Sequence, residues 1–172
     1  MIVSYEPKFV HHLLQYMTSA DGAGLEATRL VSEEEYYKDR GFSFGSIHNL
    51  LVHQMVAQKT WLRRFLGESP QGRLENQTEH PTRELLIERW PKVHAELLGF
   101  AAGQTRESVN RVITVRRNNG ELLTAPLGAM MMHVADHGTY HRGQLATMLK
   151  QAGATPPYAP YYRFVIEPGK QS

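Results

Sequence analysis

The chain has 172 residues, of which 41% are hydrophobic, and this is enough apolar material for one sizeable core. Its 19 basic and 17 acidic residues are spread along the sequence and give a formal net charge of +2, without the dense basic block that tracks phosphates. We therefore expect no nucleic-acid partner. The absence of cysteine excludes disulfides, thiolate metal sites and a thiol nucleophile, so any metal ion must bind nitrogen and oxygen.

The sequence also bears on location and domain number. The N-terminus lacks a basic start followed by an unbroken apolar run, and no stretch approaches the roughly 18 apolar residues of a membrane span. We expect a cytoplasmic protein without a membrane partner. The length predicts a single domain over residues 1–172.

The first predicted helix runs from Phe9 to Ala20, because apolar residues recur there at helical spacing and Pro7 suits a first helical turn. A polar, glycine-containing connection from Asp21 to Gly45 follows it. Within this connection Ser32 begins a sequence that resembles a capping box, which predicts a short helix from Glu33 to Lys38.

Two further long helices come next. The second predicted helix runs from Ser46 to Leu66, with apolar residues on one broad arc, and ends at Gly67. The third runs from about Pro81 to Ala102, with Thr82 as its candidate cap.

The last part of the chain changes character twice. Alternating residues from Arg111 to Arg116, an Asn119–Gly120 turn and the segment Glu121 to Thr124 predict a small β-hairpin. Pro126 then opens the last long helix, which runs to about Gln151. The tail, residues 155–172, is rich in proline and is expected to be extended and packed on the bundle. Four long helices and one hairpin predict an all-α four-helix bundle.

Three of the nine histidines, His133, His137 and His141, stand four residues apart on the last predicted helix. Each step of four rotates by only ~40°, so these side chains project from one face. The apolar stripe of this helix lies on the same face: Met130, Val134, Leu145 and Met148. The imidazoles of His137 and His141 should therefore point inward, where a neutral imidazole is a strong ligand for zinc, nickel, iron or copper.

The residues alone leave alternatives open. An H-x-x-x-H pair is also compatible with two hydrogen-bonded core histidines, and no glutamate of the H-E-x-x-H hydrolase motif lies between these two. A third ligand must come from another helix. The second helix offers His48 and His53, of which helical periodicity favours His53, and the first helix offers His11 and His12.

Two motifs connect the chain to a known family. The segments FSFGSIHNLLVHQMVAQKTWL and HVADHGTYHRGQLATMLKQAG stand at the expected separation, followed by a tail rich in proline and tyrosine. With these motifs, the helix order and the hairpin, nearly the whole chain resembles the DinB/YfiT-like metalloenzyme superfamily. The resemblance implies an up-down-down-up four-helix bundle, commonly a homodimer. It also implies one divalent metal ion, such as zinc, nickel, iron or manganese, on His53, His137 and His141.

The sequence departs from the family in two places. Members often have an acidic residue shortly after the second-helix histidine, where this chain has Gln54, Gln58 and Lys59. In the tail, Ala159 stands where many members place an aspartate before an aromatic residue. No catalytic acid or base is therefore assigned. We interpret His133, one turn from the site, as a supporting or structural residue.

Other residues of the last-helix motif are interpreted as structural. Arg142 and Gln144 are expected to make structural hydrogen bonds, and Gly143 to permit close helix packing. Four residues that would line a cavity around a functional site are interpreted as core residues instead: Met55, Trp61, Met131 and Tyr140.

Two functional hypotheses follow. The first is a metal-dependent enzyme of the hydrolase or thiol-dependent S-transferase type, acting on a small molecule that is still unknown, with a low-molecular-weight thiol as one candidate. The second is a non-catalytic metal-binding protein of a stress or damage response, in which the ion braces the bundle and the surface serves partner or dimer contacts.

Overall fold

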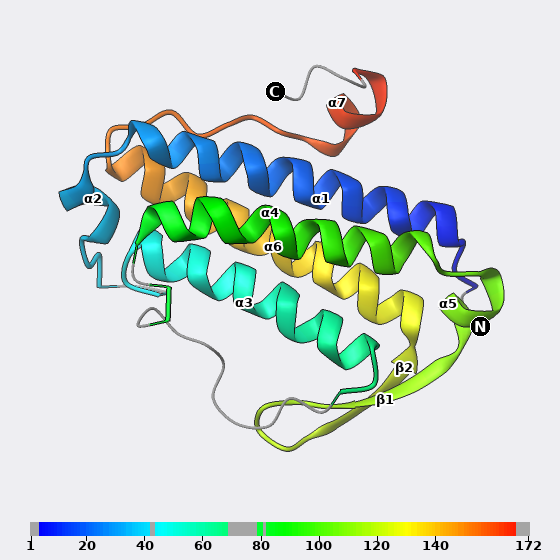
Figure 1. Cartoon of the computed structure of the whole chain (residues 1–172). Helices are drawn as coiled ribbons and strands as arrows, with labels where there is room; N and C mark the ends of the chain where they lie inside the picture. The colour runs from blue at the N-terminus through cyan, green and yellow to red at the C-terminus, as the bar shows by residue number, and fades with distance from the viewer. Residues whose placement is uncertain (1–3, 42–43, 69–78, 81, 168–172) are drawn as a thin grey trace.

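The computed structural model describes residues 4–41, 44–68, 79–80 and 82–167. Four long helices form the bundle in Figure 1: α1 (Pro7–Ala27), α3 (Ile47–Phe65), α4 (Arg83–Ala102) and α6 (Leu127–Gln151). The shorter elements are a 3-10 turn (Thr28–Leu30), α2 (Glu33–Tyr37), α5 (Arg106–Asn110), β1 (Val112–Arg116), β2 (Leu122–Pro126) and α7 (Tyr161–Ile166). The predicted helical class with a small hairpin is confirmed.

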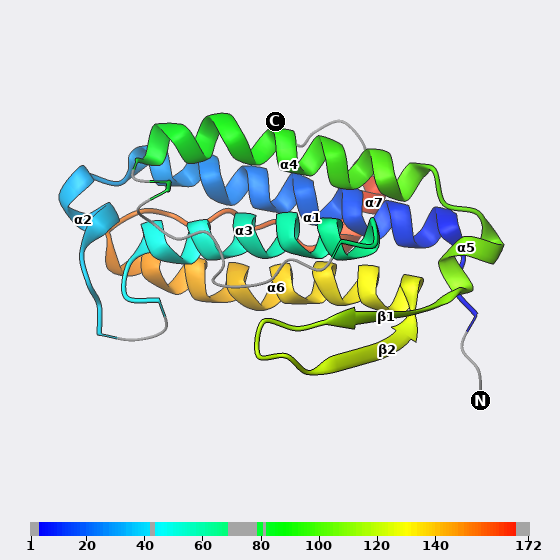
Figure 2. The same ribbon diagram turned by 60° about the horizontal axis from the view of Figure 1, so that its bottom comes forward.

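The long helices follow the expected topology. The colours of Figure 1 show that α1 and α6 run in one direction while α3 and α4 run in the other, which is the up-down-down-up order. Helices α1 and α3 each pack on both α4 and α6. Figure 2 shows α1 and α4 on one side of the bundle and α3 and α6 on the other. The second and last predicted helices are therefore neighbours.

Side-chain caps explain where several helices begin. Ser46 Oγ accepts a hydrogen bond from the Asn49 N–H at 3.1 Å, and Thr82 Oγ1 accepts one from the Leu85 N–H at 3.3 Å. Ser32 caps α2 in the same way. These caps confirm the predicted helix starts at Ser46 and Thr82, whereas Pro81 lies outside the described residues.

The hairpin precedes α6 as the sequence predicts. Strands β1 and β2 pair antiparallel with Thr114 opposite Thr124, and Gly120 has a φ of 88°, which a glycine adopts without a steric penalty. The core continues from the hairpin end of the bundle to the α2 end. Trp61 and Met131 are buried in its hairpin half and Met55 in its other half, which supports the interpretation of these three as core residues. Tyr140 is 67% exposed, so the interpretation of this residue as core is wrong.

Helix α1 continues to Ala27, so the prediction that it ends at Ala20 is wrong. A Cβ atom at Gly24 would lie 2.9 Å from Leu145 Cδ2, which shows that this glycine allows α1 to approach α6. The prediction for Gly143 is also wrong, since a Cβ atom there would meet no atom within 4 Å. At Gly138 a Cβ atom would lie 3.0 Å from Arg142 Nη1.

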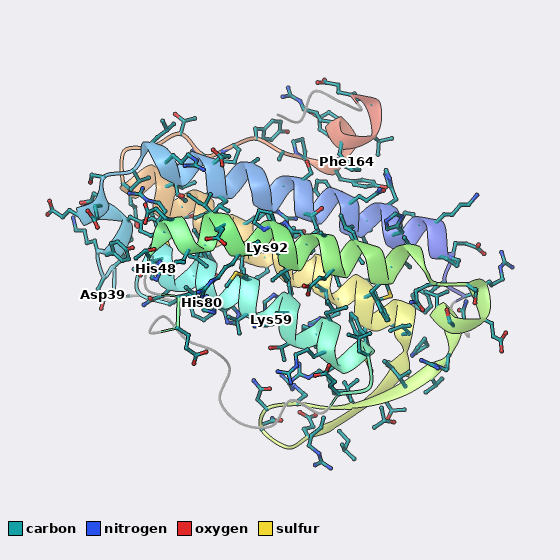
Figure 3. The ribbon with its side chains drawn as sticks, viewed as in Figure 1. Asp39, His48, Lys59, His80, Lys92 and Phe164 are labelled. Atoms are coloured by element: carbon teal, nitrogen blue, oxygen red, sulfur yellow. The ribbon has the colours of Figure 1, made fainter. Side chains whose placement is uncertain are left out.

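The tail contains a short helix, so the prediction of a wholly extended segment is wrong over Tyr161–Ile166. Pro160 stands immediately before α7, where a missing N–H does not interrupt any helical hydrogen bond. Phe164 points from α7 toward α1, as Figure 3 shows, and its ring centroid lies 5.1 Å from that of His12. Residues 168–172 of the predicted tail lie outside the described residues.

Helix α5 was not predicted. It is a single short turn whose start is fixed by a capping box, in which Thr105 and Ser108 bond each other's backbone N–H groups. None of the described helices combines the length and the apolar composition needed to cross a membrane.

Candidate metal centre

The three histidines predicted to bind a metal ion meet between α3 and α6. His53 projects from α3, and His137 and His141 project from successive turns of α6. His137 Nε2 lies 3.3 Å from His53 Nε2 and 3.1 Å from His141 Nε2. One ring nitrogen from each residue lies within 4.8 Å of the other two.

These distances suit a metal-binding site as well as hydrogen bonds between the rings. A tetrahedral zinc ion with bonds of about 2.0–2.1 Å holds its ligand atoms roughly 3.3 Å apart, close to the two separations that meet at His137. A proton on His137 Nε2 can be donated to only one of its two neighbours. Three neutral rings therefore leave lone pairs facing each other, and a cation would satisfy them together.

Burial favours the neutral form of all three rings. Burial is the main cause that lowers the pKa of His53 to about 4, and the charge of His141 adds to it. Burial likewise lowers the pKa of His137 to about 4, together with the charges of the three neighbouring histidines: His141, His53 and His133. Burial also lowers the pKa of His141, although Gln144 and Asp21 oppose this shift. At neutral pH the three rings are therefore in the neutral form, which is the form in which imidazole binds a metal ion.

Neighbouring side chains hold two of the rings. The Phe44 ring stacks on His53 with centroids 4.2 Å apart and an interplanar angle of 22°. Gln144 Oε1 lies 2.6 Å from His141 Nδ1, the nitrogen that faces away from the cluster. The exposed ring of Tyr140 stands beside His141, with centroids 5.1 Å apart.

Within the described part of the chain, the cluster contains three histidines and no carboxylate. One buried acid acts on the cluster from outside it: the charge of Asp21 raises the pKa of His137 and His141. Asp21 is already engaged, because its oxygens accept hydrogen bonds from Arg142 Nη1 at 2.8 Å and Gln58 Nε2 at 2.7 Å.

Sequence reasoning missed the network around Asp21, because it placed this residue in a connection. Asp21 of α1 is fully buried, and Gln58 of α3 links it to the Trp90 indole N–H of α4 at 2.8 Å. His94 Nε2 lies 3.7 Å from Asp21 Oδ2, and Arg142 completes the network from α6. All four long helices meet here. The available signal was that Asp21 continues the helical apolar stripe of α1.

The remaining candidate ligands lie elsewhere. His48 is buried beside α2, where its Nδ1 lies 3.3 Å from the Tyr36 hydroxyl, and Figure 3 shows it at that end of the bundle. His133 is exposed and packs against the Trp61 ring, with centroids 5.2 Å apart. His12 packs on the tail. Among the described residues, only His53 joins the pair on α6.

Comparison with known proteins agrees with this architecture. The DinB family matches residues 1–169 of the chain. The protein belongs to the DinB family. This family member is 24% identical over 151 residues to Protein DinB of Bacillus subtilis (strain 168), a match that covers 84% of this chain and 87% of that protein.

Two solved structures resemble this DinB family protein. A DinB-like protein from Bacillus cereus has a TM-score of 0.62 at 17% identity, covering 86% of this chain and 95% of that one. YfiT from Bacillus subtilis, described as a probable metal-dependent hydrolase with an unusual four-helix bundle topology, has a TM-score of 0.61 at 13% identity, covering 87% of this chain and 91% of that one. These likenesses establish the fold.

Proposed function

We propose that this DinB family protein is a metal-dependent enzyme that holds one divalent ion on His53, His137 and His141. The observation that carries the proposal is the convergence of three ring nitrogens, with separations of 3.1 and 3.3 Å at His137, in rings that burial keeps neutral. Three protein ligands leave a coordination position open, as in catalytic rather than structural sites.

The proposed reaction is a hydrolysis or a thiol-dependent S-transfer on a small molecule. When bound, a divalent ion supplies a Lewis acid that activates water or a thiolate near neutral pH. The chain's own residues orient the donors: Phe44 holds the plane of His53, and Gln144 contacts the outer nitrogen of His141. The hydrolase description of YfiT supports the first reaction, and a low-molecular-weight thiol is the candidate substrate for the second.

The first experiment measures metal content. Elemental analysis of the purified, untagged protein should find about one equivalent of zinc, nickel, iron or manganese. A variant with His53, His137 and His141 all changed to alanine should contain none. The matched control is His133→Ala, which removes an exposed histidine from the same helix outside the cluster and should retain the ion. Equal metal content in the triple variant and the wild type would overturn the site.

A second candidate function, in which the ion braces the bundle of a non-catalytic stress-response protein, has one observation in its favour. Three described cavities, of about 470, 710 and 260 Å³, are lined mainly by α1, α4, α6 and the tail, and none of the three histidines lines them. The ion would then join α3 to α6 while partner or homodimer contacts use the surface.

Turnover separates the two functions. The zinc-loaded protein is assayed with ester, amide and phosphoester substrates, and separately with an electrophile and a low-molecular-weight thiol. The enzyme proposal requires a rate that disappears in the triple-alanine variant and remains in His133→Ala. The bracing function is supported if the protein turns over none of these substrates and a chelator lowers its melting temperature strongly.

A further inference from the structure

His141 differs from the other two histidines in how its outer nitrogen is satisfied. It is 5% exposed, and its Nδ1 lies 2.6 Å from Oε1 of Gln144, which stands three residues later on α6. No hydrogen-bond partner of the Nδ1 atoms of His53 or His137 is found among the described residues. His53 is held by stacking on Phe44 instead.

The chemistry of this contact selects one form of the ring. In this orientation Oε1 of Gln144 faces the ring, and an amide oxygen accepts hydrogen bonds and cannot donate them, so a neutral His141 ring that bonds it carries its proton on Nδ1. Its Nε2 then presents a lone pair toward His137, 3.1 Å away. In the other tautomer an N–H group would point into the cluster, and it would exclude a cation from the place where the three nitrogens meet.

The position of Gln144 is itself fixed by packing of α6 on α1. Arg142, between His141 and Gln144 in sequence, donates a hydrogen bond to Asp21 of α1 at 2.8 Å. This ion pair is almost completely buried, with side chains 14% and 0% exposed. The turn of α6 that carries both His141 and Gln144 is therefore held against the bundle independently of their own contact.

We propose that Gln144 is a positioning residue that fixes the Nδ1–H tautomer and the orientation of His141, so that its Nε2 lone pair faces the cluster. The consequence for metal affinity rests on the proposed metal site, whereas the tautomer itself does not. Hydrogen-bond partners of this kind typically change metal affinity by 10- to 100-fold when they are removed.

The first test needs no metal. Nitrogen-15 NMR of the metal-free protein, with histidine ring labelling, distinguishes the two neutral tautomers of His141. In the wild type, the neutral His141 ring should carry its proton on Nδ1. Gln144→Leu should lose this preference, whereas Gln144→Glu should keep it, because a carboxylate also accepts a hydrogen bond from Nδ1–H. Gln151→Leu, an exposed change on the same helix, is the control and should keep the wild-type signal. An Nε2–H tautomer in the wild type would overturn the inference.

The second test measures zinc affinity by competition with a chelator of known strength. Gln144→Leu should bind zinc about 10- to 100-fold more weakly than the wild type, while Gln144→Glu and Gln151→Leu should bind at least as tightly. Unchanged affinity in a folded Gln144→Leu protein contradicts the role in binding. If the wild type binds none of zinc, nickel, iron and manganese, the proposed function fails, and the NMR comparison still decides the role of Gln144.

Discussion

Two groups of buried polar side chains share α6 and differ in their charge. His137 and His141 belong to a cluster of bases whose pKa values are lowered, mainly by burial, so that the cluster is neutral. Arg142, the next residue, belongs to a charged network. There burial acts to raise the pKa of Asp21, but His94 and Arg142 outweigh it and hold that pKa below its usual value.

This difference in charge explains why the histidine cluster, and not the Asp21 network, is suited to bind a cation. The Asp21 carboxylate accepts hydrogen bonds from the cation Arg142 and from Gln58, so its charge is balanced within the protein. The histidine cluster contains only donors of lone pairs and lacks an acid among the described residues. Burial alone therefore does not make a metal site, and what matters is whether the chain already supplies the opposite charge.

The largest effect is expected when the ion pair between Asp21 and Arg142 is broken. Asp21→Asn removes the negative charge and leaves Arg142, which is 14% exposed, without its partner. We expect a loss of about 3–5 kcal/mol in the free energy of unfolding, measured by urea denaturation. Glu26→Gln, an exposed change on the same helix, is the control and should have little effect. An equally small effect of Asp21→Asn would show that the ion pair is not a stabilising contact.

The second-largest effect is expected when zinc binds to the histidine cluster. With free zinc at about 100 times its Kd, the wild type should gain about 3 kcal/mol of stability. His137→Ala, which removes the nitrogen that contacts both other rings, should lose most of this gain. The measurement is the urea midpoint with and without zinc, and His133→Ala should behave as the wild type. A gain that survives in His137→Ala places the zinc somewhere else.

The third prediction uses pH to separate the two regions. The pKa values of His53 and His137 are about 4 in the folded protein and about 6.5 when unfolded, so the unfolded chain binds more protons between these values. Their contribution to stability is complete above about pH 6.5 and is lost as the pH falls toward about 4. The contribution of Asp21, whose folded pKa is lowered, is lost at more acidic pH.

This prediction is checked by urea unfolding of the metal-free protein at about pH 7 and about pH 5. The wild type should lose stability between the two, and a His53→Ala, His137→Ala double variant should lose less. Asp21→Asn should retain the wild-type difference in this range, because the aspartate titrates below it. If the wild type and the double variant lose the same free energy of unfolding between the two pH values, the fold does not hold these rings neutral.

The smallest effect comes from an ion pair at the surface. Lys92 Nζ lies 2.7 Å from Glu88 Oε1 on α4, with side chains 66% and 63% exposed, and Figure 3 shows Lys92 on that helix. Water screens such a pair, so Lys92→Gln should leave the urea midpoint almost unchanged. A large loss would mean that exposure is a poor guide to which ion pairs stabilise this bundle.

The sequence by itself determined much of this protein. Helical periodicity and capping residues located the four long helices, the Asn119–Gly120 turn located the hairpin, and the spacing of His137 and His141 placed them on one inward face. These features depend on residues close in sequence, which is why they could be predicted. The family motif added His53, which the residues alone had left beside His48, His11 and His12.

Only the tertiary structure decided the contacts between distant segments. Helix α1 continues through Asp21 although the glycines around it resemble a turn in the sequence, and this places Asp21 inside the bundle beside Arg142 of α6. Gly24 allows Leu145 of α6 to approach α1. The helical segment of the tail likewise depends on packing against His12 and Tyr16. Local propensity is weak at such positions, so the side chains that meet across the bundle determine the structure there.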